Sequence, residues 1–238
     1  MMSLNRIPTS LYTCFLILFS LALISCSTAT DPYQEGITSY NKGEYALAAN
    51  SFRKAAEQGD AMAQFNLAVM YDDGEGVEQD KAMAVKWYRM AAEQGNAEAQ
   101  FNLAVMYDYG NGVAQDRTEA VRWYREAAEQ GDAEAQINLG ISYDLGEGIA
   151  QDKAQAAAWY CRAARQGNAD GQYYLGLAYA LAEGVNPDPV MAYMWIHLAS
   201  AQGDQRARDT LEKIELFMTP AQIAEAQELA SEWEPNQP

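Results

Sequence analysis

Residues 91–96 read Ala-Ala-Glu-Gln-Gly-Asn, and this stretch decides the fold of the chain. An alanine-rich helical run stops at Gly95, because glycine enters the left-handed conformation that ends helices without a Cβ penalty. Asn96 is a residue type that caps the start of a helix by accepting hydrogen bonds from free backbone amides. The stretch therefore predicts a tight corner between two helices.

The corner returns with a period of 36 residues. Its glycines are Gly59, Gly95, Gly131, Gly167 and Gly203. An aspartate or asparagine follows each of them, at Asp60, Asn96, Asp132, Asn168 and Asp204. Self-similarity at a fixed period of this length is typical of solenoids, in which each unit contacts only its neighbours. We therefore predict an all-α fold, an α-solenoid.

Each period contains two helices. In the first, Ala63, Leu67 and Tyr71 have the i, i+4, i+8 spacing of one helical face, and the later copies repeat it. The glycine-rich turn 74–77 breaks this helix, and Asp80 is placed to cap the second one. The buried face of the second helix carries Ala84, Trp87, Tyr88 and Ala91. The unit is thus an antiparallel helix-turn-helix.

The residue pattern of this unit resembles the Sel1-like repeat, a relative of the tetratricopeptide repeat. The matching pattern is Ala-x-Ala-Gln-x-Asn-Leu-Ala-x-Met-Tyr-Asp-x-Gly-x-Gly-Val-x-Gln-Asp, followed by Ala-Val-x-Trp-Tyr-Arg-x-Ala-Ala-Glu-Gln-Gly. The copy at 169–203 departs most, with Gly171, Tyr174, Ala182 and His197. The resemblance implies a right-handed superhelix that mediates protein–protein contacts. One branch of the family, linked to β-lactam binding, has a cysteine pair in each repeat, and this chain has none.

The first residues resemble the signal sequence of a bacterial lipoprotein. Residues 11–24 form an apolar run that is too short for a permanent membrane helix and fits a signal peptide. The run ends in Leu23-Ile24-Ser25-Cys26, which resembles a lipobox with Cys26 as the lipidated residue. An unlipidated secretory signal and an uncleaved anchor are the alternatives. Ser27 after the cysteine favours, by resemblance to bacterial sorting rules, an outer-membrane lipoprotein facing the periplasm.

These features divide the chain into eight predicted segments. They are the signal peptide (1–25), the lipidated cysteine and tether (26–32), an N-terminal hairpin similar to a tetratricopeptide unit (33–59), four Sel1-like repeats (60–95, 96–131, 132–167 and 168–203), and C-terminal capping helices with a tail (204–238).

Composition excludes several functions. The chain has 33 acidic and 16 basic residues, a formal net charge of -17, which disfavours nucleic acid and anionic lipid headgroups as partners. His197 is the single histidine, and Cys161 is alone in the body of the chain, so no metal site is predicted. The acidic turn after Asp72 lacks the ligand spacing of a calcium loop, and the Gly-x-Gly turns lack a flanking strand. We predict no cofactor and no catalysis.

The sequence predicts instead a scaffold that binds a protein or peptide. First helices line the concave face of such solenoids. By resemblance to tetratricopeptide grooves, two apolar columns point into it: Phe65, Phe101, Ile137 and Tyr173, and Val69, Val105, Ile141 and Leu177. Beside them stand Asp72, Asp108 and Asp144, and then Asp73, Tyr109 and Leu145. This arrangement suits a peptide with basic flanks.

Other interpretations stay open at this point. The alternative for both apolar columns is that they are packed between neighbouring first helices and do not line a groove. A cell-wall-associated hydrolase or a β-lactam-binding protein is the alternative function, and a spacer without a groove ligand is a third.

Overall fold

The structure is a computed structural model, and it describes residues 31–235. Within that range it contains twelve helices and no strand. They are α2 (Pro32–Asn41), α3 (Tyr45–Glu57), α4 (Ala61–Asp73), α5 (Lys81–Glu93), α6 (Ala97–Tyr109), α7 (Arg117–Glu129), α8 (Ala133–Leu145), α9 (Lys153–Arg165), α10 (Ala169–Leu181), α11 (Pro189–Ala201), α12 (Gln205–Glu215) and α13 (Pro220–Glu232).

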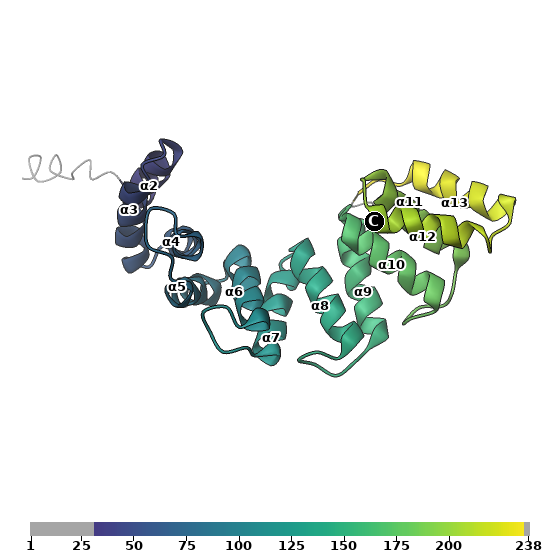
Figure 1. Cartoon of the computed structure of the whole chain (residues 1–238), viewed down its shortest axis with the longest axis horizontal. Coiled ribbons are helices and arrows are strands. Elements are labelled where there is room, and N and C mark those ends of the chain that lie inside the picture. Colours follow the sequence, from purple (N-terminus) through teal and green to yellow (C-terminus); the bar gives the residue numbers. More distant parts are fainter. Residues whose placement is uncertain (1–30, 236–238) are drawn as a thin grey trace, which may run out of the picture.

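The helices follow one another along an arc, with α2 and α3 at one end and α11 to α13 at the other (Figure 1). Each helix packs mainly against its neighbours in the chain. In Figure 1, α4, α6 and α8 follow the inner side of the arc, and α5 and α7 follow its outer side. The predicted all-α solenoid of helix pairs is confirmed.

The predicted signal peptide (1–25) and Cys26 lie outside the described residues, while the last two residues of the predicted tether form the start of α2, with Asp31 as its N-cap and Pro32 as its first residue. Among the helices that the structure does describe, none is long and apolar enough to cross a membrane.

The corner at residues 91–96 forms as predicted. Gly95 has a φ of 88°, in the left-handed region. The Asn96 side chain accepts a hydrogen bond of 2.7 Å from the Ala99 amide, and the Asn96 amide donates to the Ala91 carbonyl over 3.1 Å. Because these bonds satisfy free groups on both helices, α5 can end at Glu93 and α6 can begin at Ala97 with only three residues between them.

The second glycine of each glycine-rich turn sets how closely the repeats stack. Gly112 has a φ of 70°, and it lies directly against the backbone of Lys81, which begins α5 of the preceding repeat. A Cβ atom at Gly112 would overlap the Lys81 carbonyl group. The turn can therefore approach the neighbouring helix only as glycine.

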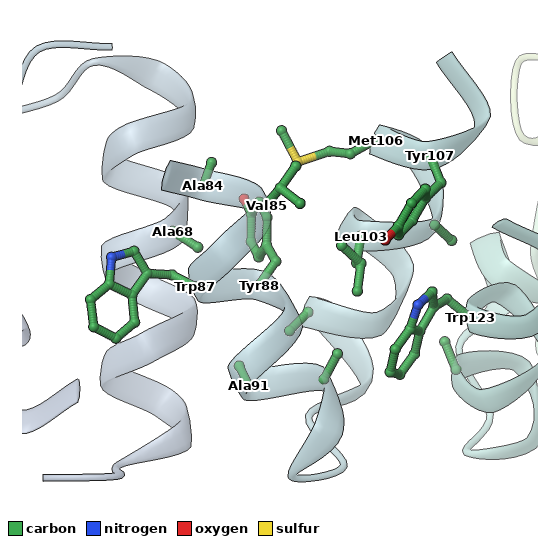
Figure 2. Packing of buried hydrophobic residues seen from close by; sticks show 14 of the residues in the cluster. Ala68, Ala84, Val85, Trp87, Tyr88, Ala91, Leu103, Met106, Tyr107 and Trp123 are labelled. Atoms are coloured by element: carbon green, nitrogen blue, oxygen red, sulfur yellow. The ribbon is translucent and has the colours of Figure 1, made fainter. Parts of the chain in front are cut away.

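Aromatic pairs on the second helices fill the space between helices. Trp87 and Tyr88 are adjacent on α5 and both buried, and their side chains leave the helix in different directions (Figure 2). Trp87 points toward the helix that carries Ala68, and the Tyr88 ring lies 6.0 Å from the ring of Phe65 on α4. Both side chains therefore help to fill the space beside α4 and hold the two helices of the repeat together.

Buried glutamines form a second link between repeats. They are Gln64, Gln100, Gln136 and Gln172. The Gln100 amide donates to the Ala92 carbonyl over 3.1 Å, and its oxygen accepts from the Gln130 amide over 2.7 Å. A buried polar group is stable only when it is hydrogen-bonded, so these bonds specify one register between helices. The sequence shows that a glutamine recurs at this position of each repeat, but it does not show that the glutamine links neighbouring helices.

The C-terminal helices include a further cap. Thr219 and Gln222 exchange hydrogen bonds in a capping box that opens α13. In the fourth glycine-rich turn, Ala182 takes the place of glycine and has a φ of 58°, the one positive value at a non-glycine residue between 31 and 235.

Candidate functional site

The first predicted apolar column is largely taken up by packing. Ile137 is only 4% exposed, and the other members are half-buried. The Phe101 ring lies 6.0 Å from the Tyr124 ring, and the Arg206 guanidinium lies 4.8 Å from the Tyr173 ring centre. Phe65 has a matching contact with Tyr88. These residues contribute little open apolar surface.

The second predicted apolar column is intermediate between buried and exposed. Val69, Val105, Ile141 and Leu177 are all half-buried. Val69 and Val105 pack against the core of the N-terminal repeats, and Ile141 and Leu177 against the core of the C-terminal repeats. Each therefore presents one edge to the inner surface while its remaining atoms hold neighbouring helices together.

The acids predicted to border the groove are already paired. Asp72, Asp108 and Asp144 each form an ion pair with the first residue of the following helix: Lys81 (2.6 Å), Arg117 (3.5 Å) and Lys153 (2.6 Å). Two of these bases also reach the next repeat, where Arg117 lies 3.1 Å from Glu147 and Lys153 lies 3.3 Å from Glu183. The border is thus a chain of ion pairs across repeats.

The environment of Asp108 illustrates the electrostatics of this border. Burial raises the pKa of its carboxyl group, the Arg117 guanidinium lowers it, and Glu147 raises it. The carboxylates outnumber the cations at these junctions, since Asp108 and Glu147 share Arg117. The border keeps a negative balance, but it is less available to a partner than free acids would be.

The last residue of each first helix provides the open surface. Asp73 is exposed, Tyr109 is 69% exposed and Leu145 is 59% exposed, and Leu181 one period later is 62% exposed. The sequence prediction named the first three and missed Leu181, although the 36-residue period places it in the same column. We call Tyr109, Leu145 and Leu181 the apolar column; these three residues are distinct from the two predicted columns described above. Large apolar side chains exposed at one place in successive repeats are typical of a binding surface.

Two predicted residues meet in a pocket. Asp144 and Leu177 line a cavity of about 120 Å³ between α9 and α10. The other lining residues, which were not predicted from the sequence, are Lys153, Ala156, Ala157, Tyr160, Tyr174, Ala178, Leu181 and Glu183.

The column of Cys161 and His197 has a structural role in the earlier repeats. Arg125, in the same column, donates a hydrogen bond of 3.1 Å to the Tyr143 hydroxyl of the next repeat. Cys161 is a free, half-buried thiol, and the His197 ring stacks on Tyr193 at 5.8 Å. No group of three His, Cys, Asp or Glu side chains between residues 31 and 235 is arranged to hold a metal ion.

Comparison with known proteins connects this geometry to a family. The Sel1 repeat model matches residues 41–60, 61–96, 97–132, 133–168 and 169–204, which together make up most of the chain. No curated protein matches the chain.

Two solved structures are similar. A protective antigen of uropathogenic Escherichia coli with an SLR fold is 35% identical, with a TM-score of 0.75 over 84% of this chain and 45% of its own. A Sel1 repeat protein from Oxalobacter formigenes is 40% identical, with a TM-score of 0.65 over 71% of this chain and 49% of its own. This chain therefore spans about half the length of either. Since the family model covers five successive units, the chain belongs to the Sel1 repeat family.

Proposed function

We propose that the protein is a non-catalytic scaffold that binds a protein or peptide on the inner surface of its arc. The observation that carries this proposal is the apolar column of Tyr109, Leu145 and Leu181, exposed along three successive repeats. An extended or helical segment lying across the first helices would contact one member of the column per repeat. The Sel1 repeat fold is typical of such protein–protein scaffolds.

Charge favours a basic partner. The chain carries a formal net charge of -17, and carboxylates outnumber bases at the border of the inner surface. A basic segment would be attracted before contact and would share the carboxylates Glu147 and Glu183 after it. Because these acids are partly exposed and paired, their effect is mainly on the rate and selectivity of association.

The test uses two variants with matched changes. Tyr109→Glu with Leu145→Glu places charges in the apolar column, and Leu216→Glu with Phe217→Glu places them at two residues that are 80% and 89% exposed beside α12. Because all four side chains are exposed, both variants are expected to fold. In envelopes of the native cell, crosslinked partners measured by quantitative mass spectrometry should fall at least tenfold for the first variant and remain for the second. Loss with the second variant alone would contradict the proposal.

We further propose that Cys26 carries a lipid that holds the scaffold in the bacterial envelope, at the outer membrane and facing the periplasm. The sequence Leu23-Ile24-Ser25-Cys26 supports it. A Cys26→Ser chain is expected to leave the membrane fraction, and labelling with a fatty-acid analogue should disappear. Cys161→Ser is the matched control, because it removes a thiol from the folded body, and it should keep both properties. Labelling that persists in Cys26→Ser would refute the anchor.

A further inference from the structure

The junctions between successive repeats are not filled equally. At the first, Val85 on α5 and Met106 on α6 are buried and point toward one another (Figure 2). One period later the same positions are Val121 and Ser142, and two periods later they are Ala157 and Ala178. The side chains that close the first junction are thus missing at the third.

The space that they leave is the pocket of about 120 Å³ between α9 and α10. Ala157 and Ala178 are among its lining residues, together with Tyr160, Tyr174, Leu177 and Leu181. The Tyr160 and Tyr174 rings stack at 5.1 Å. Tyr174 stands where the earlier copies have Asn102 and Asn138, so the stacked wall is specific to this junction.

The mouth of the pocket is charged. Lys153 lies 2.6 Å from Asp144 and 3.3 Å from Glu183, and all three side chains are partly exposed. Two carboxylates thus share one ammonium group, which leaves a negative balance. Burial raises the pKa of the Tyr160 hydroxyl, and the nearby Asp144 carboxylate raises it further, so the acids face the aromatic wall.

The size and lining of the pocket indicate its occupant. An apolar cavity of about 150 Å³ in a protein interior holds a ligand as large as benzene. A cavity of about 120 Å³ with alanine, leucine and tyrosine around it suits one aliphatic side chain. Its position beside Leu181 of the apolar column places that side chain on the inner surface.

We propose that the pocket between α9 and α10 seats one aliphatic side chain of a peptide partner whose neighbouring residues are basic. This inference rests on the proposed scaffold function and identifies where the partner is anchored. The aliphatic group would cover the two alanines, and a flanking ammonium or guanidinium group would share Asp144 and Glu183 with Lys153. Charge complementarity selects a basic peptide over a second copy of this chain, because the chain itself is strongly acidic.

The test uses the full chain purified in mild detergent and a labelled synthetic peptide, Gly-Lys-Gly-Lys-Leu-Lys-Gly-Lys-Gly. Three companion peptides carry methionine or glycine at the centre, or glutamate in place of every lysine. Binding is followed by fluorescence anisotropy. We expect the leucine and methionine peptides to bind similarly, and the glycine and glutamate peptides at least tenfold more weakly. Equal binding of the glycine peptide, or no binding of the leucine peptide at about 1 mM, a limit already weaker than ordinary specific recognition, would overturn the proposal.

Two variants of the chain isolate the pocket. Ala157→Val with Ala178→Met restores the side chains of the first junction. This double variant should bind the leucine peptide at least tenfold more weakly than the unmodified chain. Ala178→Ser installs the residue of the second junction, leaves most of the space, and should bind within about twofold. If circular dichroism shows that the double variant is misfolded, Ala157→Val alone replaces it. Undiminished binding to the folded, filled chain would overturn the proposal.

The outcomes also separate this inference from the function on which it rests. Suppose that crosslinked partners are retained when the pocket is filled but are lost with Tyr109→Glu and Leu145→Glu. The proposed scaffold function would then stand, and the proposed role of the pocket would be refuted. Partners that are retained in both the filled-pocket variant and the Tyr109→Glu, Leu145→Glu variant would refute the role of the pocket and the scaffold function together. The other possible occupant of the pocket is a second copy of this chain, and sedimentation of the full chain tests it. A dimer that dissociates when the pocket is filled would show that a second copy, and not a peptide partner, occupies the pocket.

Discussion

Replacing Gly148 with alanine is expected to destabilise the protein by roughly 4 kcal/mol or more, the range of exceptional point mutations. Gly148 has a φ of 72° and lies against the backbone of Arg117, the first residue of α7. A Cβ atom there would overlap the Arg117 carbonyl oxygen and carbon. Since neither is the end of a flexible side chain, the turn and α7 must separate, and the stacking of two repeats is lost.

The control isolates that overlap from the cost of the backbone conformation. Gly43 has a φ of 77°, close to that of Gly148, and an added Cβ atom would meet nothing within 4 Å. Gly43→Ala should therefore cost only the left-handed penalty of about 1–2 kcal/mol. The free energy of unfolding, from urea titrations followed by circular dichroism, measures both. Equal losses in the two variants would show that backbone conformation alone explains the glycine.

Leu103→Ala is expected to cost about 3 kcal/mol, within the range for a buried leucine that leaves a cavity. Leu103 is 0% exposed and lies on α6, in the middle of the arc. Because each repeat is stabilised only by its neighbours, a cavity in a middle repeat weakens the coupling between the two halves. We therefore expect a lower midpoint in urea and also a broader transition.

Leu145→Ala is the matched comparison. It removes the same atoms from a side chain that is 59% exposed, and such surface changes usually alter stability by no more than about 0.5 kcal/mol. Its transition should keep the width of the unmodified protein. A loss in Leu145→Ala as large as that in Leu103→Ala would mean that the apolar column is packed in solution and is not an open surface.

The helix corners and caps were predictable because their causes are local. Gly95 and Asn96 adopt the conformations that their own side chains favour, and the bonds that they make reach residues only a few positions away. The 36-residue period then repeated this local evidence, so the solenoid followed without knowledge of any distant contact.

The candidate surface was predicted less completely. The period placed Phe101 and Asp108 on the inner side, but the sequence could not show how much of each side chain remains open. Tyr124 packs beside Phe101, and Arg117 links Asp108 to Glu147 of the next repeat. Exposure is set by residues from other helices, which a single helical face does not reveal.

From the sequence alone one can derive the helices, their order and the periodic positions that face inward, since these depend on backbone preference and on spacing along the chain. Tertiary structure alone decided which of those positions are open and where the pocket lies. Ala157 and Ala178 are on different helices and are unremarkable separately, because alanine is common on both. They leave a cavity only where α9 and α10 pack together, since the missing volume belongs to the pair of helices and to neither one alone.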